Sequence, residues 1–389
     1  MLSWLAPLAV LGLVVFVHEL GHFLAAKIVG VYAPRFSLGW GKALLKWRPH
    51  GTETEYVLSA LPIGGYVRMA SRLDETASAL EGGNEEVKPG AEQATNWDRE
   101  AMTPHGPKPV PADRWFESKP TWARVFILLA GVTMNAILTI VVSTGVFAYY
   151  GRRVVPAVVD TVVTGRPAER AGFQRGDSIV SIDGMHVRYW NDVLDQVGGA
   201  PGRELRIEVA RGGRRETLAV TPEAQELADD VSGAKTRVGR IGAGPVQRTS
   251  NERLSAGSAL NAGWHATWSM GGSVLGVLGG LFRGTVSVKT LGGPIAIARV
   301  SVQAAQSGLE PLFTLIAFLS INLAVLNLLP VPILDGGQVL ITVVEGIRGK
   351  ALGDRVRDVL MKAGLAVIAT LFVFVMFNDL KALVLSIFG

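Results

Sequence analysis

The sequence predicts an α-helical membrane protein with four spans and a β-rich domain outside the membrane. Hydrophobic residues make up 49% of the 389 residues and charged residues only 18%, whereas soluble domains typically carry roughly 25% charged residues. The mean hydropathy is +0.32. Four stretches are each close to the ~20 apolar residues that a spanning helix needs. Short β-rich runs gather between the second and third of these stretches.

The predicted spans lie at residues 1–27, 124–151, 311–337 and 363–389. The first could instead be a cleaved signal peptide, but it lacks a basic leading region and exceeds the apolar core of about 7–15 residues in such peptides. A further uncharged stretch, 254–282, is rich in Gly and Ser. We expect it to form one or two helices at the membrane surface, within an extracytoplasmic linker that covers residues 225–310.

The distribution of Lys and Arg predicts the orientation of the spans. Residues 338–362 form a basic loop, which the positive-inside rule places in the cytoplasm. Both chain termini and the β-rich domain are then extracytoplasmic. Residues 28–123 are cytoplasmic, and 71–123 have few aliphatic residues, which predicts a flexible loop. The absence of a transit peptide favours the inner membrane of a bacterial cell.

Composition also excludes several kinds of chemistry. The chain has no cysteine, which excludes disulfides, cysteine-ligated zinc, iron–sulfur clusters and a thiol nucleophile. A net charge of +5 and a pI near 9.5 could indicate nucleic-acid binding. However, the basic residues are dispersed and often flank apolar runs, so we expect membrane lipid, and no nucleic acid, as their partner.

The first span contains ionisable residues in the sequence HELGH. His18 and His22 are four residues apart and share one helix face, so both imidazoles can reach one metal ion. Glu19 lies about 100° further round the helix, where it can act as a general base without being a ligand. This is the HExxH arrangement of zinc enzymes. Two histidines hydrogen-bonded inside a bundle are the alternative, but unpaired ionisable groups are costly in a bilayer, which favours a functional site.

The predicted third ligand is Asp335, in NLLPVPILDGG at the end of the third span. The first and third spans both run from outside to inside, so Asp335 and His18 lie toward the cytoplasmic side. A span at 254–282 would place them at opposite faces. Pro330 and Pro332 cannot both belong to a regular helix, which predicts an unwound segment lining a cavity. A proline-kinked helix with Asp335 at the interface is the alternative.

HELGH followed by NLLPVPILDGG resembles the motifs of the site-2 protease family of intramembrane zinc metalloproteases, in particular bacterial RseP-type regulators of intramembrane proteolysis. The resemblance implies one zinc ion per chain, bound by His18, His22 and Asp335, with Glu19 activating a water molecule. It also implies a substrate-positioning role for the asparagine and prolines of the second motif, namely Asn327, Pro330 and Pro332.

Two further stretches resemble this family. Residues 28–70 are similar to its membrane-re-entrant region, and TEYVLSALPIGGYVRM reads as a strand followed by a Pro–Gly–Gly turn. An exposed strand edge there could pair with an unfolded substrate, which makes Gly64, Gly65 and Tyr66 candidate substrate-binding residues. A purely structural hairpin is the alternative. LLAGVTMNAIL resembles the second-span GPxxN element, with Val132 in place of proline. Its Asn135 could approach the metal site or bridge two helices.

Residues 152–224 resemble PDZ domains of the bacterial protease type, chiefly through VVDTVVTGRPAERAGFQRGDSIVSIDGMHV. SIVSI reads as a strand, PAERAG as a short helix, and the stretch around Gly212 and Gly213 as a hairpin. PDZ domains bind an extended peptide or a C-terminus by adding a strand to a sheet edge. The resemblance implies control of substrate access, and a rigid plug or spacer is the alternative.

Together these features predict an intramembrane zinc metalloprotease that cleaves transmembrane segments of single-pass membrane proteins. An anti-sigma factor or signal-peptide remnants would be typical substrates of the family. The main alternative is a non-catalytic zinc-containing PDZ membrane scaffold, against which the intact Glu19 argues because a structural zinc needs no base. A transporter is disfavoured because four spans without an inverted repeat leave little room for alternating access.

Overall fold

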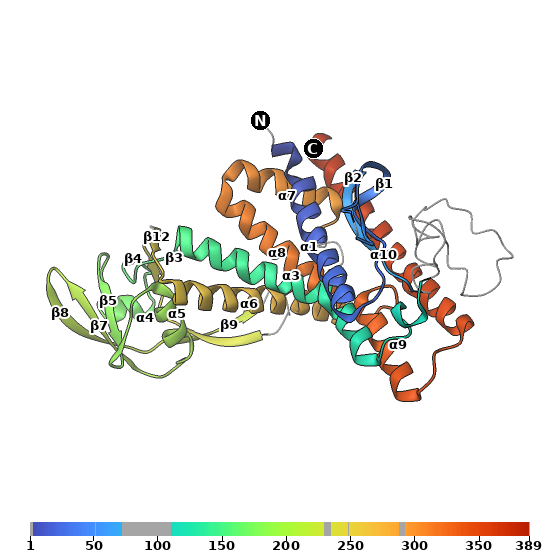
Figure 1. The fold of residues 1–389 in the computed structure, drawn as a ribbon. Coiled ribbons are helices and arrows are strands. Elements are labelled where there is room, and N and C mark those ends of the chain that lie inside the picture. The colour runs from blue at the N-terminus through green and yellow to red at the C-terminus, as the bar shows by residue number, and fades with distance from the viewer. Residues whose placement is uncertain are drawn as a thin grey trace. The chain divides into compact units, whose positions relative to one another are not determined.

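The computed structural model of the protein describes residues 3–50, 52–71, 110–228, 235–247, 249–287 and 292–388 (Figure 1). The chain divides into two compact units. One comprises Met1–Ser143, Gly263–Val274 and Val288–Gly389, and the other comprises Thr144–Ala262 and Leu275–Ser287. Residues 72–109, which make up most of the predicted cytoplasmic loop, lie outside the described residues.

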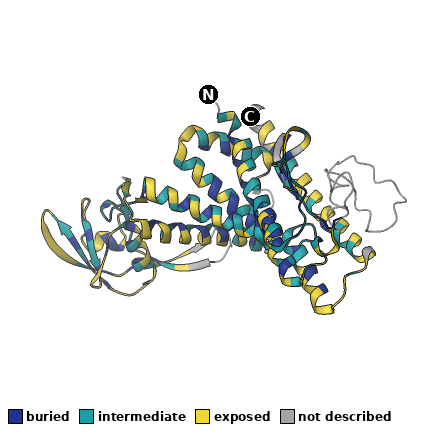
Figure 2. Ribbon diagram, in the orientation of Figure 1, coloured by how far each residue is buried: buried dark blue, intermediate teal, exposed yellow. Residues whose placement is uncertain are grey.

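Four helices in the described part of the chain are long and apolar enough to cross a membrane. They are α1 (Ala6–Val29, preceded by the 3-10 turn η1, Ser3–Leu5), α3 (Thr121–Tyr150), α8 (Leu309–Asn327) and α10 (Asp354–Phe388). Each overlaps one of the predicted spans, although α8 ends at Asn327, before the end of the predicted segment 311–337. Most of α10 is exposed (Figure 2), including Val367, Phe372 and Val373. An exposed apolar surface of this kind suits contact with lipid rather than water.

The region after the third span differs from the prediction. The basic segment 338–362 was expected to be a loop, but the short helix α9 (Asp335–Arg348) occupies its first part and α10 already begins at Asp354. The loop prediction is therefore wrong for most of this segment. At 14 residues α9 is too short to span a membrane, so a search for long apolar runs cannot find it.

Residues 254–282 form one continuous helix, α6 (Ala256–Arg283), which ends at Gly284 in a left-handed conformation with a φ of 73°. It is followed by α7 (Pro294–Ser307), which Gly308 joins directly to α8. The N-terminus of α7 is capped from another helix. The Asp379 carboxylate of α10 accepts hydrogen bonds from the N–H groups of Gly293, Ile295 and Ala296 at 2.9–3.1 Å. These bonds satisfy N–H groups that a helix leaves without intrahelical partners.

The strands β1 (Arg35–Trp47) and β2 (Glu55–Arg68) lie beside α1 (Figure 1). The segment 35–38 pairs in parallel with 55–58 and antiparallel with 65–68, so β2 reverses direction between these two arms. Gly64 lies in the reversal with a φ of 92°, which L side chains rarely adopt. The reversal occurs at the predicted Pro–Gly–Gly turn. Phe23 of α1 packs against Phe36 and Val67, which fixes the sheet to the helix.

The second unit is rich in β structure. Its main sheet has the antiparallel order β6–β5–β7–β8, formed by β5 (Ser178–Ile182), β6 (Met185–His186), β7 (Leu205–Arg211) and β8 (Arg214–Val220). The helices α4 (Pro167–Arg170) and α5 (Trp190–Gly198) belong to the same unit. The strand SIVSI, the helix in PAERAG and the hairpin at Gly212 and Gly213 are where the sequence predicts them.

The limit of this unit lies beyond the predicted residue 224. Three returning strands pair with earlier ones: β10 (Lys235–Arg240) with β9 (Glu223–Ala228), β11 (Ala243–Pro245) with β4 (Val159–Val162), and β12 (Ser250–Glu252) with β3 (Arg152–Val154). The stretch predicted to be a linker therefore completes the domain, because β11 and β12 cover edges that residues 152–224 alone would leave open.

Candidate metal centre

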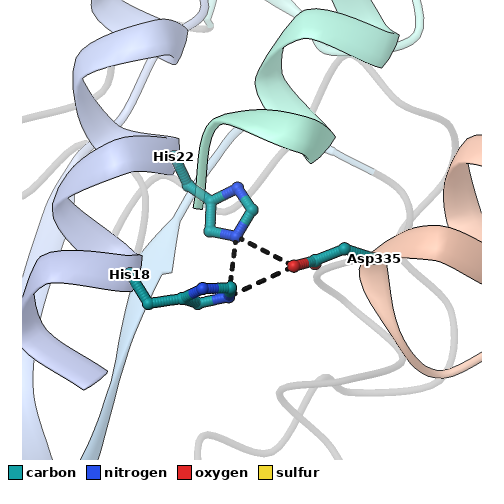
Figure 3. A group of neighbouring side chains, drawn as sticks. All are labelled: His18, His22 and Asp335. Carbon is teal, nitrogen blue, oxygen red and sulfur yellow. Dashed lines mark hydrogen bonds and ion pairs between the residues drawn. The ribbon is translucent and has the colours of Figure 1, made fainter. Parts of the chain in front are cut away.

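Three side chains converge in the helical unit (Figure 3). His18 and His22 come from α1, and Asp335 is the first residue of α9. His18 Nε2 lies 3.1 Å from Asp335 Oδ2, and His22 Nε2 lies 3.4 Å from the same oxygen. The two Nε2 atoms are 3.2 Å apart. The structure thus brings together the three residues that were predicted to be ligands.

This geometry fits a zinc ion. Tetrahedral zinc with bonds of ~2.0–2.2 Å to nitrogen and oxygen separates its ligand atoms by roughly 3.3–3.5 Å. The three observed separations between ligand atoms, 3.1, 3.2 and 3.4 Å, are close to this expected separation. Asp335 Oδ2 is buried, and within the described residues it has no hydrogen-bond donor apart from these histidine nitrogens. Three protein ligands are typical of catalytic zinc, which keeps its fourth position open.

A close approach of α3 to α1 shapes the centre. A Cβ atom at Gly131 would lie 2.4 Å from His22 Nε2 and 2.7 Å from His18 Cε1, and one at Gly21 would lie 2.4 Å from the Ala130 carbonyl oxygen. Only glycine fits at such distances. As a result, the carbonyl oxygen of Ile127 comes within 2.8 Å of His22 Nδ1 and accepts a hydrogen bond from it. The proton on Nδ1 leaves the Nε2 lone pair free for a metal.

The segment between α8 and α9 delivers Asp335. Residues 328–334 are not helical, which agrees with the predicted unwinding at Pro330 and Pro332. A Cβ atom at Gly336 would lie 2.2 Å from the Leu328 carbonyl oxygen, and one at Gly337 would lie 2.0 Å from that of Val331. The glycine pair therefore lets the unwound chain fold against the start of α9. The carbonyl oxygen of Pro332 accepts a hydrogen bond from Gln338, whereas Pro330 is exposed.

Asn327 and β2 contribute further groups near the centre. Asn327 Nδ2 lies 3.1 Å from His18 Nε2, so its amide is beside a nitrogen of the His–His–Asp group. Glu19 accepts a hydrogen bond from the backbone N–H of Val67 in β2. A Cβ atom at Gly65 would lie 3.4 Å from Glu19 Cγ. The sheet thus reaches Glu19 through Gly65 and Val67, while Gly64 and Tyr66 flank this contact in sequence.

Sequence reasoning missed the backbone contributions to this centre. The Ile127 carbonyl and the Val67 N–H carry no residue-specific signal, because any residue supplies these groups. The GVTMN stretch of the second span was a usable signal, since Gly131 and Asn135 lie one helical turn apart. The helix α3 continues across Val132, where a proline would have interrupted its hydrogen bonds.

The class of the molecule is a multi-span helical membrane protein with a His–His–Asp metal site. The first span supplies the two histidines, and the short helix after the third span supplies the aspartate. The chain belongs to peptidase family M50, whose model matches residues 6–371. The match covers every residue of the metal centre. The chain is accordingly a zinc metalloprotease of the site-2 protease type, and the zinc cofactor predicted from the sequence is confirmed.

Individual relatives are similar over nearly their whole lengths. A protein of Brucella suis, named provisionally as a zinc metalloprotease, is 35% identical over 380 residues, which cover 96% of this chain and 94% of the relative. The metalloprotease MmpA of Caulobacter vibrioides is 33% identical, with the same two coverages. The zinc metalloprotease RasP of Bacillus licheniformis is 31% identical over 98% of this chain and 99% of its own.

Proposed function

We propose that this zinc metalloprotease cleaves transmembrane segments of single-pass membrane proteins inside the membrane. The observation that carries the proposal is the position of the His–His–Asp group. His18 and His22 are buried within α1, one of the four apolar helices that are long enough to span a bilayer. A peptide bond can reach these side chains only by entering the helical unit.

The side chains divide the chemistry among them. His18, His22 and Asp335 would hold zinc, which supplies a Lewis acid that polarises water and the scissile carbonyl. Glu19 takes a proton from the attacking water and delivers it to the leaving amine. The N–H of Val67 orients the Glu19 carboxylate for this transfer. The Asn327 amide, beside His18, donates a hydrogen bond to the substrate carbonyl.

The β2 strand gives the substrate a place to bind. The arm 65–68 pairs with 35–38 on one side, and its other edge has no strand partner among the described residues. An extended substrate backbone can add a strand along such an edge, with Gly64, Gly65 and Tyr66 beside it. A transmembrane helix has its carbonyls already hydrogen-bonded, so the substrate must unwind before cleavage. Pro330 and Pro332 belong to the unwound segment 328–334, and the substrate would lie across this segment.

The β-rich unit would control access to this centre. We assign it as a PDZ-type domain on the extracytoplasmic side, where it binds an extended peptide or a C-terminus and admits substrates that have already been shortened. The likeness of residues 152–224 to such domains supports this role, and the basic segment 338–362 supports a bacterial inner-membrane orientation with both termini outside. Regulated intramembrane proteolysis of an anti-sigma factor or a signal-peptide remnant would use this arrangement.

The test is Glu19→Gln in the full-length protein, incubated in proteoliposomes with a tagged single-pass substrate. We expect the cut fragment to disappear while zinc content stays at the wild-type level, because Gln keeps the shape but cannot accept a proton. Glu204→Gln, an exposed residue of the second unit, is the matched control. Unchanged cleavage by the Glu19 variant would reject the mechanism. Cleavage of an unfolded soluble peptide, but not of the membrane-embedded segment, would reject the intramembrane substrate.

A further inference from the structure

We infer that Asn135 is a positioning residue for the metal ligand His18, whose ring it holds by accepting a hydrogen bond from Nδ1. This inference rests on the metal site described above and adds the group that orients one of its ligands. Asn135 lies in the middle of the apolar helix α3 and is fully buried. Its side-chain amide faces His18, with Nδ2 3.4 Å from His18 Nδ1.

The protonation of His18 determines which amide atom must face it. His18 Nε2 lies 3.1–3.2 Å from Asp335 Oδ2 and His22 Nε2, so it is the metal-facing nitrogen and must offer a lone pair. The ring proton then resides on Nδ1, which needs an acceptor. A half-turn of the Asn135 amide about its Cβ–Cγ bond places Oδ1 where Nδ2 stands.

The surroundings of the amide favour that half-turn. Asn135 Oδ1 is buried without a hydrogen-bond partner within the described residues. A buried acceptor or donor that is left unsatisfied destabilises the fold, because it has lost its hydrogen bonds to water. One rotation pairs Oδ1 with the Nδ1 proton, which satisfies that acceptor and that donor, and moves Nδ2 to the former position of Oδ1. Metal-bound histidines generally donate their second N–H to such an oxygen.

The helix α3 performs the same task for both histidines. Ile127, Gly131 and Asn135 are spaced four residues apart, so they share one face of α3. The Ile127 carbonyl oxygen accepts the His22 Nδ1 proton at 2.8 Å, Gly131 leaves room for both rings, and Asn135 faces His18. Three successive turns of α3 therefore form a surface that orients the two imidazoles.

Packing of α3 against α8 does not need the Asn135 side chain. The main-chain carbonyl of Asn135 accepts hydrogen bonds from Ser320 Oγ and Thr139 Oγ1, both at 2.9 Å. Thr139 also donates to the Ala317 carbonyl at 3.1 Å. These bonds join the helices through backbone oxygens that remain in any Asn135 variant. The positioning role can therefore be separated from interhelical adhesion.

The experiment measures zinc affinity of full-length protein in detergent by chelator competition, and the visible spectrum of the cobalt-substituted form. We expect Asn135→Leu to weaken zinc binding 10–100-fold, the usual loss when a partner of a metal-bound histidine is removed. Asn135→Asp retains an acceptor, so we expect wild-type or tighter binding and an unchanged cobalt spectrum. Ser320→Ala, which loses one interhelical bond but touches neither histidine, is the matched control and should bind zinc normally.

Each outcome has a distinct meaning. Wild-type zinc affinity in Asn135→Leu, or an equal loss in Ser320→Ala, would overturn the positioning role. Asn135→Ala provides a second acceptor-free variant if the leucine prevents folding, which thermal unfolding will show. Full zinc binding by His18→Ala would instead reject the metal site itself, so the two failures are distinguishable.

Discussion

Glu345 and Arg357 form a buried ion pair, with 2.8 Å between Oε1 and Nη2. The other oxygen, Oε2, lies 3.3 Å from Arg124 Nη1 at the start of α3. The Glu345 side chain is only 3% exposed. Because Glu345 and Asp335 belong to the same helix, this cluster connects the helix that presents the third metal ligand to the beginnings of α3 and α10.

We predict that Glu345→Gln destabilises the protein by about 3–5 kcal/mol, because it leaves two partly buried guanidinium groups without their carboxylate. The measurement is thermal unfolding in detergent together with zinc content. The exposed pair of Asp358 and Lys362 on α10 provides the control. Asp358→Asn should change stability by less than about 0.5 kcal/mol. Equal effects of the two substitutions would show that burial of Glu345 is unimportant.

Removing a ligand should abolish zinc binding. Asp335→Ala leaves only two histidines, and we expect an affinity loss greater than the roughly 10–100-fold that loss of an outer partner alone produces. Elemental analysis of the purified protein gives the zinc content per chain. Asp358→Asn again serves as a carboxylate control. Retention of one zinc per chain in Asp335→Ala would mean that another residue completes the site.

Gly131→Ala tests the close approach of α3 to the histidines. The added methyl group would overlap His22 Nε2 at 2.4 Å, and overpacking of this kind costs about 1–3 kcal/mol. We therefore expect loss of zinc and of proteolysis. Gly145 lies on the same helix with no atom within 4 Å of its hypothetical Cβ. There alanine should stabilise the helix by up to about 1 kcal/mol, and an impaired Gly145→Ala would point to a general intolerance of α3.

The β-rich unit should lose stability in acid. Burial alone would raise the pKa of Asp177, but two hydrogen bonds from Arg211, each 2.7 Å long, and one from the Gln174 N–H lower it below its usual range. A carboxylate with a lowered folded-state pKa stabilises the fold above its unfolded pKa, near 4. This stabilisation disappears as the pH falls through the folded-state value.

Hydrogen exchange of the full-length protein, corrected for intrinsic rates, measures this effect in β5 and β7. We expect protection to fall as the pH drops below about 4. Asp177→Asn should be poorly protected even at pH 7 and should depend little on pH in the acidic range. Exposed Asp195, changed to Asn, is the control. The same acid response in wild type and Asp177→Asn would assign the effect to other groups.

Much of the architecture could be predicted because its signals are local. The four spans follow from long apolar runs, and His18, Glu19 and His22 follow from helical spacing. Asp335 required a topological argument, namely that two spans running in the same direction bring their ends to one side. The structure places Asp335 Oδ2 within 3.4 Å of both histidines.

The features that could not be predicted depend on contacts between distant segments. The cap on α7 comes from Asp379, more than 80 residues later in the chain. The strands β11 and β12 return to β4 and β3, which formed much earlier in the chain, so composition alone placed the domain limit too soon. The short helix α9 contacts α3 and α10 through Glu345, which pairs with Arg124 and Arg357, and these partners cannot be identified from the sequence of α9.

The wide separation of the ligands has a consequence for biosynthesis. Asn327 follows His18 by 309 residues, and Asp335 comes later still. The first span is therefore synthesised long before Asp335. Through most of translation the chain contains only His18 and His22 of the three ligands. The His–His–Asp group is therefore completed only after α8 has been synthesised and Asp335 has been added at the start of α9.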